Sequence, residues 1–254
     1  MRIVLLSVDD EFAGLMQKKL YERHPGWIVG SVISTRDIYK RNRISAMAFI
    51  VQKCGLYYFM QMVRMKMLRK VFFPGQKVLP STLARRHCVE IFRSTNINDS
   101  RSMEKLEDWK ADVLISTNFS HYIGKAARSV ARFGAWNLHK SYLPHYRGMA
   151  PSFFALLEGA KTAGTTLHVV ESGIDTGPVL AQARIPVEHD DTVYGLNRRT
   201  SEHGGTMLAH FMESVDFEKL QAMPQGEGAW KTYTYPNRAE VALFRRKGLR
   251  FDRP

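Results

Sequence analysis

The chain has 254 residues, of which 44% are hydrophobic and 24% are charged, and it carries a formal net charge of +13. This composition predicts a soluble globular protein with a sizeable core, and the absence of any run of about 18 apolar residues argues against a membrane span. The net charge predicts attraction to anions such as nucleotides, nucleic acids or an anionic membrane face, without choosing among them.

The cysteines and the N-terminal residues bear on the compartment. Cys54 and Cys88 lie far apart, with no Cys-x-x-Cys or histidine-rich partner nearby. This argues against a disulfide framework or a metal site and favours a cytoplasmic protein. The apolar run that starts at Ile3 is too short for a signal peptide and meets acidic residues from Asp9 onward, so a buried first strand is expected there.

Strands alternate with helices over the first half of the chain. Apolar runs predict strands over residues 3–7, 27–33, 88–92, 113–117 and 135–139, and helices over residues 11–24, 103–109 and 124–131. This alternation predicts parallel pairing and a doubly wound, mostly parallel α/β sheet. In such sheets ligands gather at the carboxyl ends of the strands.

One segment, residues 36–86, interrupts the alternation with twelve Lys or Arg, a single acid and five methionines. Apolar residues recur there at helical spacing, at Leu56, Met60, Val63 and Met67. The pattern predicts an inserted helical pair, broken at Gly55 and ended by Pro74-Gly75. A solvated cationic face, a pocket for a diphosphate and an amphipathic surface resting on anionic lipid all remain open for it.

The second half predicts a helix, two strands and a long helix, over residues 151–158, 165–170, 179–187 and from Asp191-Thr192 onward. A linker follows at 221–228, and residues 230–254 are expected to form a short strand-rich tail that turns at Lys247-Gly248. The expected division is therefore a domain over residues 1–220, which includes the basic insert, and an appendage over residues 221–254.

The densest cluster of candidate functional residues runs from Asn137 to Pro151. Asn137 and His139 are two positions apart on a predicted strand, so their side chains share a face, about 7 Å apart along the chain. An amide aimed at a carbonyl oxygen and an imidazole near the attacking nucleophile together suit acyl transfer. Taken alone, Asn-x-His is more often a strand end with a capping asparagine and a surface histidine.

The wider context carries a resemblance. The stretch N-x-H-x-S-x-L-P-x-x-R-G-x-x-P starts at Asn137, and Asp175 follows 38 positions later in Ser-Gly-Ile-Asp-Thr-Gly-Pro. Together they resemble the formyltransferase family, which includes glycinamide ribonucleotide transformylase, methionyl-tRNA formyltransferase and the sugar-nucleotide N-formyltransferases. The resemblance covers about residues 1–190. It implies a Rossmann-like fold and transfer of a formyl group from 10-formyltetrahydrofolate to a primary amine.

The resemblance also implies roles for individual residues. Asn137 would hydrogen-bond the formyl oxygen, His139 would assist proton transfer, and Asp175 would keep His139 in the required protonation state. The residues alone agree, since a carboxylate close to an imidazole raises its pKa. A simple turn between two glycines is the structural alternative for Asp175, and His168 is expected to support the site at most.

By the same resemblance, the pterin ring of the donor would lie between residues 118–123 and the loop 171–175. The implied donor-binding residues are Phe119, Ser120, Tyr122, Ile123, Val170 and Gly173. The expected acceptor-binding residues are Ser141, Arg147, Gly148 and Pro151. Phe119 and Ile123 could equally be core residues, and Arg147 could be a solvated loop arginine instead of an anion ligand.

Departures from the relatives bear on the acceptor. The first strand leads into an acidic, glycine-free loop at Asp9 and Asp10, a poor seat for the phosphate that glycinamide ribonucleotide transformylase holds. The tail is shorter than the C-terminal domain of methionyl-tRNA formyltransferase. The expected acceptor is therefore a nucleotide-linked amino sugar; a methionyl-tRNA-like amine and a lipid-linked amino sugar are the alternatives.

Other classes of function stay open. A non-catalytic protein that binds nucleic acid or a membrane surface would also suit the charge, but the joint presence of Asn137, His139 and Asp175 disfavours nucleic-acid binding. A homodimer through the tail is a further expectation. The tail aromatics Trp230, Tyr233 and Tyr235 could stack on a base, form that contact, or pack at a strand edge.

Overall fold

The computed structural model describes residues 1–35, 43–72, 78–226 and 230–252. At its centre is a seven-stranded sheet in the order β3-β2-β1-β4-β5-β7-β8. The strands are β1 (Ile3–Val8), β2 (Ile28–Ser34), β3 (Ile91–Ser94), β4 (Val113–Thr117), β5 (Ala135–His139), β7 (Thr162–Val169) and β8 (Val179–Pro186). The first five pair in parallel, whereas β5–β7 and β7–β8 pair antiparallel. The expected mostly parallel sheet is confirmed.

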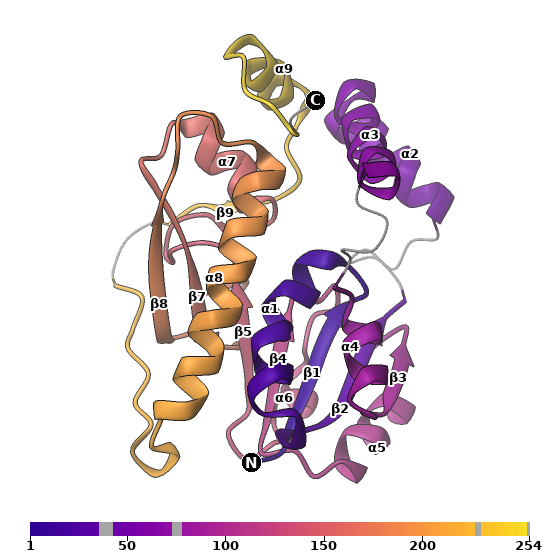
Figure 1. Ribbon diagram of the computed structural model, residues 1–254, viewed down its shortest axis with the longest axis vertical. Helices are drawn as coiled ribbons and strands as arrows, with labels where there is room; N and C mark the ends of the chain where they lie inside the picture. Colours follow the sequence, from indigo (N-terminus) through magenta and orange to yellow (C-terminus); the bar gives the residue numbers. More distant parts are fainter. Residues whose placement is uncertain (36–42, 73–77, 227–229, 253–254) are drawn as a thin grey trace.

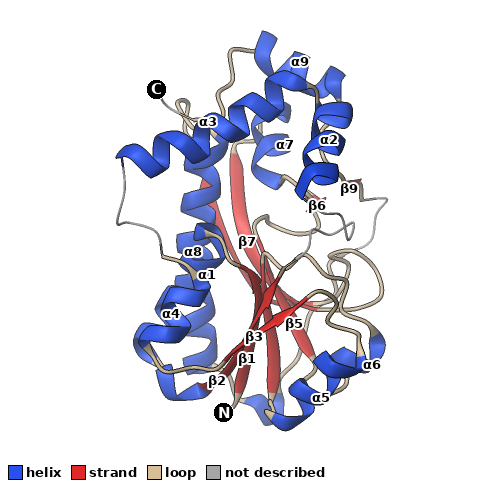
Figure 2. Cartoon of the chain, turned by 90° about the vertical axis from the view of Figure 1, so that its right-hand side faces the viewer, coloured by secondary structure: helices blue, strands red, loops and turns tan. Residues whose placement is uncertain are grey.

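Helices cover both faces of the sheet (Figures 1 and 2). The α-helices that accompany the sheet are α1 (Glu11–Arg23), α4 (Pro80–Arg86), α5 (Ser100–Asp108), α6 (Lys125–Arg128), α7 (Pro151–Glu158) and α8 (Val193–Ser214), and short 3-10 turns lie at Pro25–Trp27 and Phe217–Lys219. Alternation along β1 explains the two layers, because successive side chains of a strand point to opposite faces. Ile3 and Leu5 pack with α1, α4 and α8, whereas Val4 and Leu6 pack with α5 and α6.

The predicted helical pair is present as α2 (Arg43–Cys54) and α3 (Leu56–Phe72), which meet at Gly55 with φ +90°. The predicted end at Pro74-Gly75 lies outside the described residues. α4, which also falls within residues 36–86, covers the sheet: its Leu83 and Ala84 are buried in the main core. The pair itself lies at the end of the molecule that also holds α7 and the C-terminal helix (Figures 1 and 2).

The prediction of a strand-rich C-terminal tail was wrong. Its single described strand is β9 (Thr232–Tyr233), which pairs in parallel with β6 (Arg147–Gly148), and Arg238–Arg246 form helix α9. A capping box begins this helix, because the Asn237 side chain accepts from the Glu240 N–H and the Glu240 carboxylate accepts from the Asn237 N–H. The expected hairpin turn is the end of the helix, where Gly248 takes φ +71°.

None of the helices in the described part of the chain combines the length and hydrophobicity that a membrane crossing requires.

Candidate active site

Asn137 lies between its neighbours on β4 and β7. Across the parallel pair it faces Ser116, whose hydroxyl donates to Asn137 Oδ1 at 2.6 Å. Across the antiparallel pair it faces His168, and Asn137 Nδ2 lies 3.1 Å from His168 Nε2. His168 Nδ1 lies 2.8 Å from the Val169 carbonyl oxygen. Both histidine contacts are satisfied when the proton is on Nδ1, so that Nε2 accepts from the asparagine amide.

Asp175 occupies the centre of the cluster. Its Oδ2 accepts from the Gly148 N–H at 2.7 Å, and its Oδ1 accepts from Asn137 Nδ2 at 3.3 Å. His139 Nδ1 lies 3.4 Å from Oδ2, and His168 Nε2 lies 3.5 Å from Oδ1. The Asp175 backbone has φ +52°, a left-handed conformation that aspartate tolerates better than most residues. The structure thus brings Asp175, which is remote in sequence, into contact with both Asn137 and His139.

His139 is held in one orientation. Its ring is only 8% exposed, and Nε2 lies 3.0 Å from the Tyr146 carbonyl oxygen, which can accept the Nε2 proton. That bond leaves Nδ1 directed at Asp175. The cluster therefore offers an oriented ring nitrogen beside a carboxylate, the arrangement that general acid–base catalysis uses.

Two opposing effects set the charges. Burial lowers the pKa of His139 below its ordinary value, although the Asp175 carboxylate opposes the shift. Burial pushes the pKa of Asp175 upward, but His139, His168 and the Gly148 N–H outweigh it, so this pKa lies below its usual range. At neutral pH the pair is an ionised carboxylate beside a neutral imidazole, which can take up a proton and then be stabilised as the imidazolium.

Comparison with known proteins identifies the family. The model of the formyl transferase family matches residues 1–212. The chain belongs to the formyl transferase family. The methionyl-tRNA formyltransferase of Methylacidiphilum infernorum is 30% identical over 171 residues, which cover 66% of this chain and 53% of that protein. The methionyl-tRNA formyltransferase of Acidithiobacillus ferrooxidans is 32% identical over 155 residues, which cover 61% of this chain and 49% of that protein. The chain thus spans about half the length of these curated relatives.

Solved formyltransferases share the fold at lower identity. An N-formyltransferase from Helicobacter canadensis, in complex with folinic acid and dTDP-3-aminofucose, aligns with TM-score 0.64 and 16% identity over 92% of this chain and 71% of that one. A sugar 3N-formyl transferase solved with dTDP and 5-N-formyl-THF aligns with TM-score 0.62 and 15% identity, over 92% of this chain and 70% of that one. The phosphoribosylglycinamide formyltransferase of Streptococcus pneumoniae aligns with TM-score 0.59 and 18% identity, over 84% of this chain and 97% of that one.

Gln225 is a site residue that sequence reasoning missed. Its Nε2 donates to the backbone oxygens of Asp175 at 2.8 Å and Gly177 at 2.6 Å, and its Oε1 accepts from Arg147 Nε at 3.0 Å and from an Arg147 terminal nitrogen at 2.6 Å. Arg147 is therefore tied to the loop that carries Asp175. Gln225 lies in the predicted linker and belongs to no motif, so only the folded chain reveals this contact.

The two expected walls of the donor site lie against each other. The Tyr122 hydroxyl donates to the Ser172 carbonyl at 3.4 Å, and one Arg128 nitrogen donates to the carbonyls of Ile123 at 2.9 Å and Glu171 at 3.0 Å. Tyr122 is 57% exposed and available to a ligand, whereas Ile123 is 4% exposed and packs into the core. The Ile123 side chain is therefore a core residue, which was the alternative considered for it.

The remaining donor-site candidates differ in accessibility. Phe119 and Val170 are half-buried and pack on the same core cluster as Ile123, and Gly173 is exposed in the Asp175 loop. The Ser120 hydroxyl is hydrogen-bonded to Ser34. The exposed backbone of the 171–174 loop and the Tyr122 ring are thus the accessible surfaces for a pterin ring.

The expected acceptor-binding residues divide in the same way. Ser141 is 2% exposed and donates to the His145 carbonyl at 2.7 Å, and Pro151 is buried at the start of α7. Both side chains are buried in this structure, and their contact with an acceptor stays a prediction. Arg147 and Gly148 are half-buried beside Asp175 and remain candidates.

The loop after β1 disfavours a phosphate. One oxygen of Asp10 caps α1 by accepting from the Ala13 N–H at 2.8 Å, and the other accepts from Asn118 Nδ2 at 2.6 Å. Asp9 accepts from the backbone and hydroxyl of Ser81 at 3.0 and 2.8 Å. A helix N-terminus attracts phosphate through unpaired N–H groups and positive potential. Here a carboxylate already occupies that position.

Proposed function

We propose that this chain transfers the formyl group of 10-formyltetrahydrofolate to a primary amine, with Asn137, His139 and Asp175 at the reacting centre. The observation that carries the proposal is the contact of one carboxylate with both the Asn137 amide at 3.3 Å and the His139 imidazole at 3.4 Å. Membership of the formyl transferase family supports the reaction. Fold neighbours crystallised with folinic acid or 5-N-formyl-THF support the class of donor.

The proposed reaction assigns one task to each side chain. The acceptor amine attacks the formyl carbon, and negative charge develops on the formyl oxygen. Asn137 Nδ2 donates to this oxygen the N–H that reaches Asp175 Oδ1 at 3.3 Å in this structure. His139 Nδ1 takes the proton that the amine nitrogen loses as the new C–N bond forms, and Asp175 stabilises the resulting imidazolium. Breaking the bond to the folate nitrogen, which takes up a proton, completes the transfer and yields tetrahydrofolate and a formamide.

Gly148→Ala is expected to lower kcat/KM for formyl transfer by about 10²-fold, since misplacing a catalytic group by about 1 Å has an effect of that size. Gly148 has φ +89°, and a Cβ there would lie 2.2 Å from the Tyr233 carbonyl oxygen of β9. Relieving that clash moves the N–H that binds Asp175. Kinetics and thermal melting of the purified variant measure the effect.

Gly159→Ala is the matched control. Gly159 has φ +71° at the end of α7, and a Cβ there would meet no atom within 4 Å. The substitution therefore adds only the left-handed backbone strain of about 1–2 kcal/mol, and kcat/KM is expected to stay within about twofold. Equal losses in both variants would show that Gly148 acts through stability alone.

For the acceptor we propose a nucleotide-linked amino sugar. Two fold neighbours, each covering 92% of this chain, were solved with dTDP or a dTDP amino sugar. The carboxylate-capped start of α1 disfavours a glycinamide ribonucleotide phosphate in that position. Methionyl-tRNA is the second candidate, because the curated relatives that match at about 30% identity carry that name.

A panel of amines decides between these acceptors. The chain is incubated with 10-formyltetrahydrofolate and, separately, with nucleotide-linked amino sugars, glycinamide ribonucleotide, methionyl-tRNA and a lipid-linked amino sugar, and the formylated product is followed by mass. We expect the highest kcat/KM with a nucleotide-linked amino sugar. A higher kcat/KM with any of the other three amines would overturn the acceptor proposal but leave the proposed formyl transfer intact. If none of the amines were formylated, both proposals would be contradicted.

The expected homodimer stays a prediction. Tyr233, one of the tail aromatics considered for that contact, is buried: its ring centroid lies 4.3 Å from that of Phe154, and its hydroxyl donates to Glu158 at 2.8 Å. For this residue the packing alternative holds, so a dimer contact would have to use other parts of the tail.

A further inference from the structure

Helices α2 and α3 present large apolar side chains to solvent. The insert surface is defined by five of them, with exposed fractions between 50% and 80%: Ile44, Met47, Leu56, Met60 and Met67. On α3 the three residues recur at i, i+4 and i+11, so they share one side of the helix. Five large apolar side chains exposed on one pair of helices suggest an interaction site, since soluble monomers seldom expose large apolar patches.

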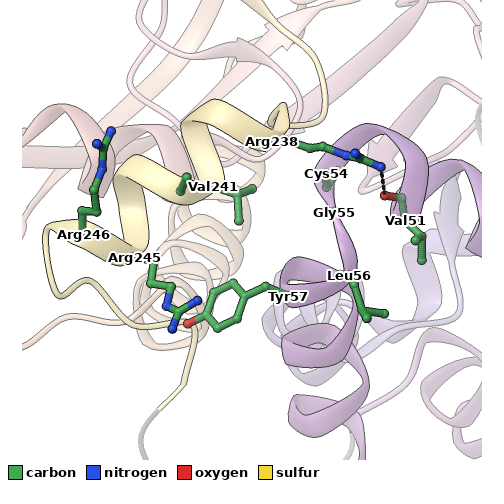
Figure 3. Close-up of a pocket in the computed structure, with 10 residues that line it drawn as sticks. Val51, Cys54, Gly55, Leu56, Tyr57, Arg238, Val241, Arg245 and Arg246 are labelled. Atoms are coloured by element: carbon green, nitrogen blue, oxygen red, sulfur yellow. Dashed lines mark hydrogen bonds between the residues drawn. The ribbon is translucent and has the colours of Figure 1, made fainter.

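The opposite side of the helical pair is firmly packed. Tyr58 is 6% exposed and meets the rings of Phe153 and Phe251 at 6.3 and 5.3 Å between centroids. Arg238 of α9 donates to the Val51 carbonyl at 3.5 Å (Figure 3). It also donates to the Gln52 carbonyl at 3.1 Å, and so satisfies the last turn of α2. The exposed apolar residues therefore lie on the outer side of a docked element.

The charge of this region has a single sign. Residues 43–72 contain six Lys or Arg and no Asp or Glu. Arg64 is exposed on α3, four positions after Met60 and three before Met67, within the apolar stripe. At the hinge between the helices, a cavity of about 660 Å³ is also bordered by Arg245 and Arg246 of α9, and the Arg245 guanidinium lies 5.2 Å from the Tyr57 ring centroid (Figure 3).

This combination of exposed apolar and cationic groups favours one kind of partner. A second copy of the same surface would bring like charges together, and a nucleic acid would leave the leucine, isoleucine and methionine side chains without apolar contacts. The interface of an anionic bilayer takes up both, since apolar side chains enter about 5–10 Å while Lys and Arg meet the lipid headgroups. We propose that the insert surface docks this protein on anionic lipid bilayers.

Contacts within the chain connect this surface to the candidate site. α9 contacts the end of α2 through Arg238, and β9, just before it in the chain, pairs with β6. Gly148 of β6 donates to Asp175. Docking would therefore hold the site in a defined orientation to the bilayer. The docking itself does not depend on the proposed formyl transfer, so the two proposals fail separately.

Vesicle co-sedimentation of the full chain tests the docking. We expect binding to phosphatidylcholine vesicles that contain phosphatidylglycerol at low ionic strength, weakening as salt is added. Binding to pure phosphatidylcholine is expected to be at least about tenfold weaker. Absence of binding to the anionic vesicles at low salt, or equal binding to both vesicle types, would overturn the proposal.

Two sets of variants separate insertion from simple charge attraction. Leu56→Gln combined with Met60→Gln keeps every charge and is expected to lower binding at least about tenfold. Met223→Gln, at a methionine 64% exposed outside the insert surface, is the matched control and should bind as the wild type does. Unchanged melting temperatures confirm folding. Binding of the double variant at the wild-type level would contradict docking through this surface. So would a double variant that binds lipid normally but no longer self-associates.

Discussion

His139→Ala is expected to lower kcat/KM for formyl transfer by about 10²- to 10⁴-fold, the range typical of a lost general acid–base group. The reason is the position of Nδ1, 3.4 Å from the Asp175 carboxylate, with the ring held by the Tyr146 carbonyl. Without this imidazole, the other imidazole beside Asp175 is that of His168, whose Nε2 already accepts from the Asn137 amide, so the attacking amine loses its proton acceptor. Steady-state kinetics with a saturating donor measure the loss.

The control for this variant addresses folding. Removing a buried ring leaves space and leaves the Asp175 charge with one partner fewer, so some loss of stability is expected. His139→Asn keeps a donor at this position and should melt closer to the wild type while losing a similar amount of activity. If His139→Asn retained more than about a tenth of the wild-type rate, proton transfer at this position would not limit the reaction.

Asp175→Asn is expected to lower kcat by about 10²-fold or more and to move the acid limb of the pH–rate profile to lower pH. The active form needs a neutral His139, so the rate rises as pH increases through the pKa of His139. Burial lowers that pKa, and the Asp175 carboxylate opposes the shift. Removing the negative charge removes the opposition, so the pKa falls further. The same change withdraws stabilisation from the imidazolium that forms during transfer, so the rate falls.

Glu171→Gln is the matched control, because this carboxylate belongs to the same loop but is exposed to solvent. Its pH profile and rate are expected to follow the wild type. The double variant of His139 and Asp175 should lose little more activity than His139→Asn alone, since residues that act as a unit are not additive. An acid limb that moves to higher pH in Asp175→Asn would contradict the proposed arrangement.

The apolar run and the motif predicted the centre of the fold and site. Ala135–His139 is a strand with the predicted bounds: all its residues are buried except the half-buried Asn137, and no glycine or proline interrupts it. Asn137 and His139 therefore share a face, and both reach Asp175. The contact of Asp175 with this strand was predicted from the resemblance to the formyltransferase family, because local sequence patterns do not show which loop packs against which strand end.

Other contacts could not be predicted, because tertiary pairing decides them. His168 contacts Asn137 since β7 runs antiparallel to β5 in a register that sets the two residues opposite each other. The alternation of strands and helices predicted a mostly parallel sheet and did not show which strands would pair antiparallel. Gln225 reaches Asp175 from a segment with no regular structure. The α9 helix, in contrast, was predictable: Asn237 followed by Glu240 is a capping-box signature, and the tyrosines before it obscured that signal.

The most direct test of the central claim measures tetrahydrofolate release and formylated amine together, in the wild type and in His139→Asn. The cluster of Asn137, His139 and Asp175 predicts equal amounts of the two products from the wild type and loss of both, in parallel, from a variant that remains folded. Equal formation of the formamide by both proteins would contradict it, and so would tetrahydrofolate release by the wild type with no formylated amine.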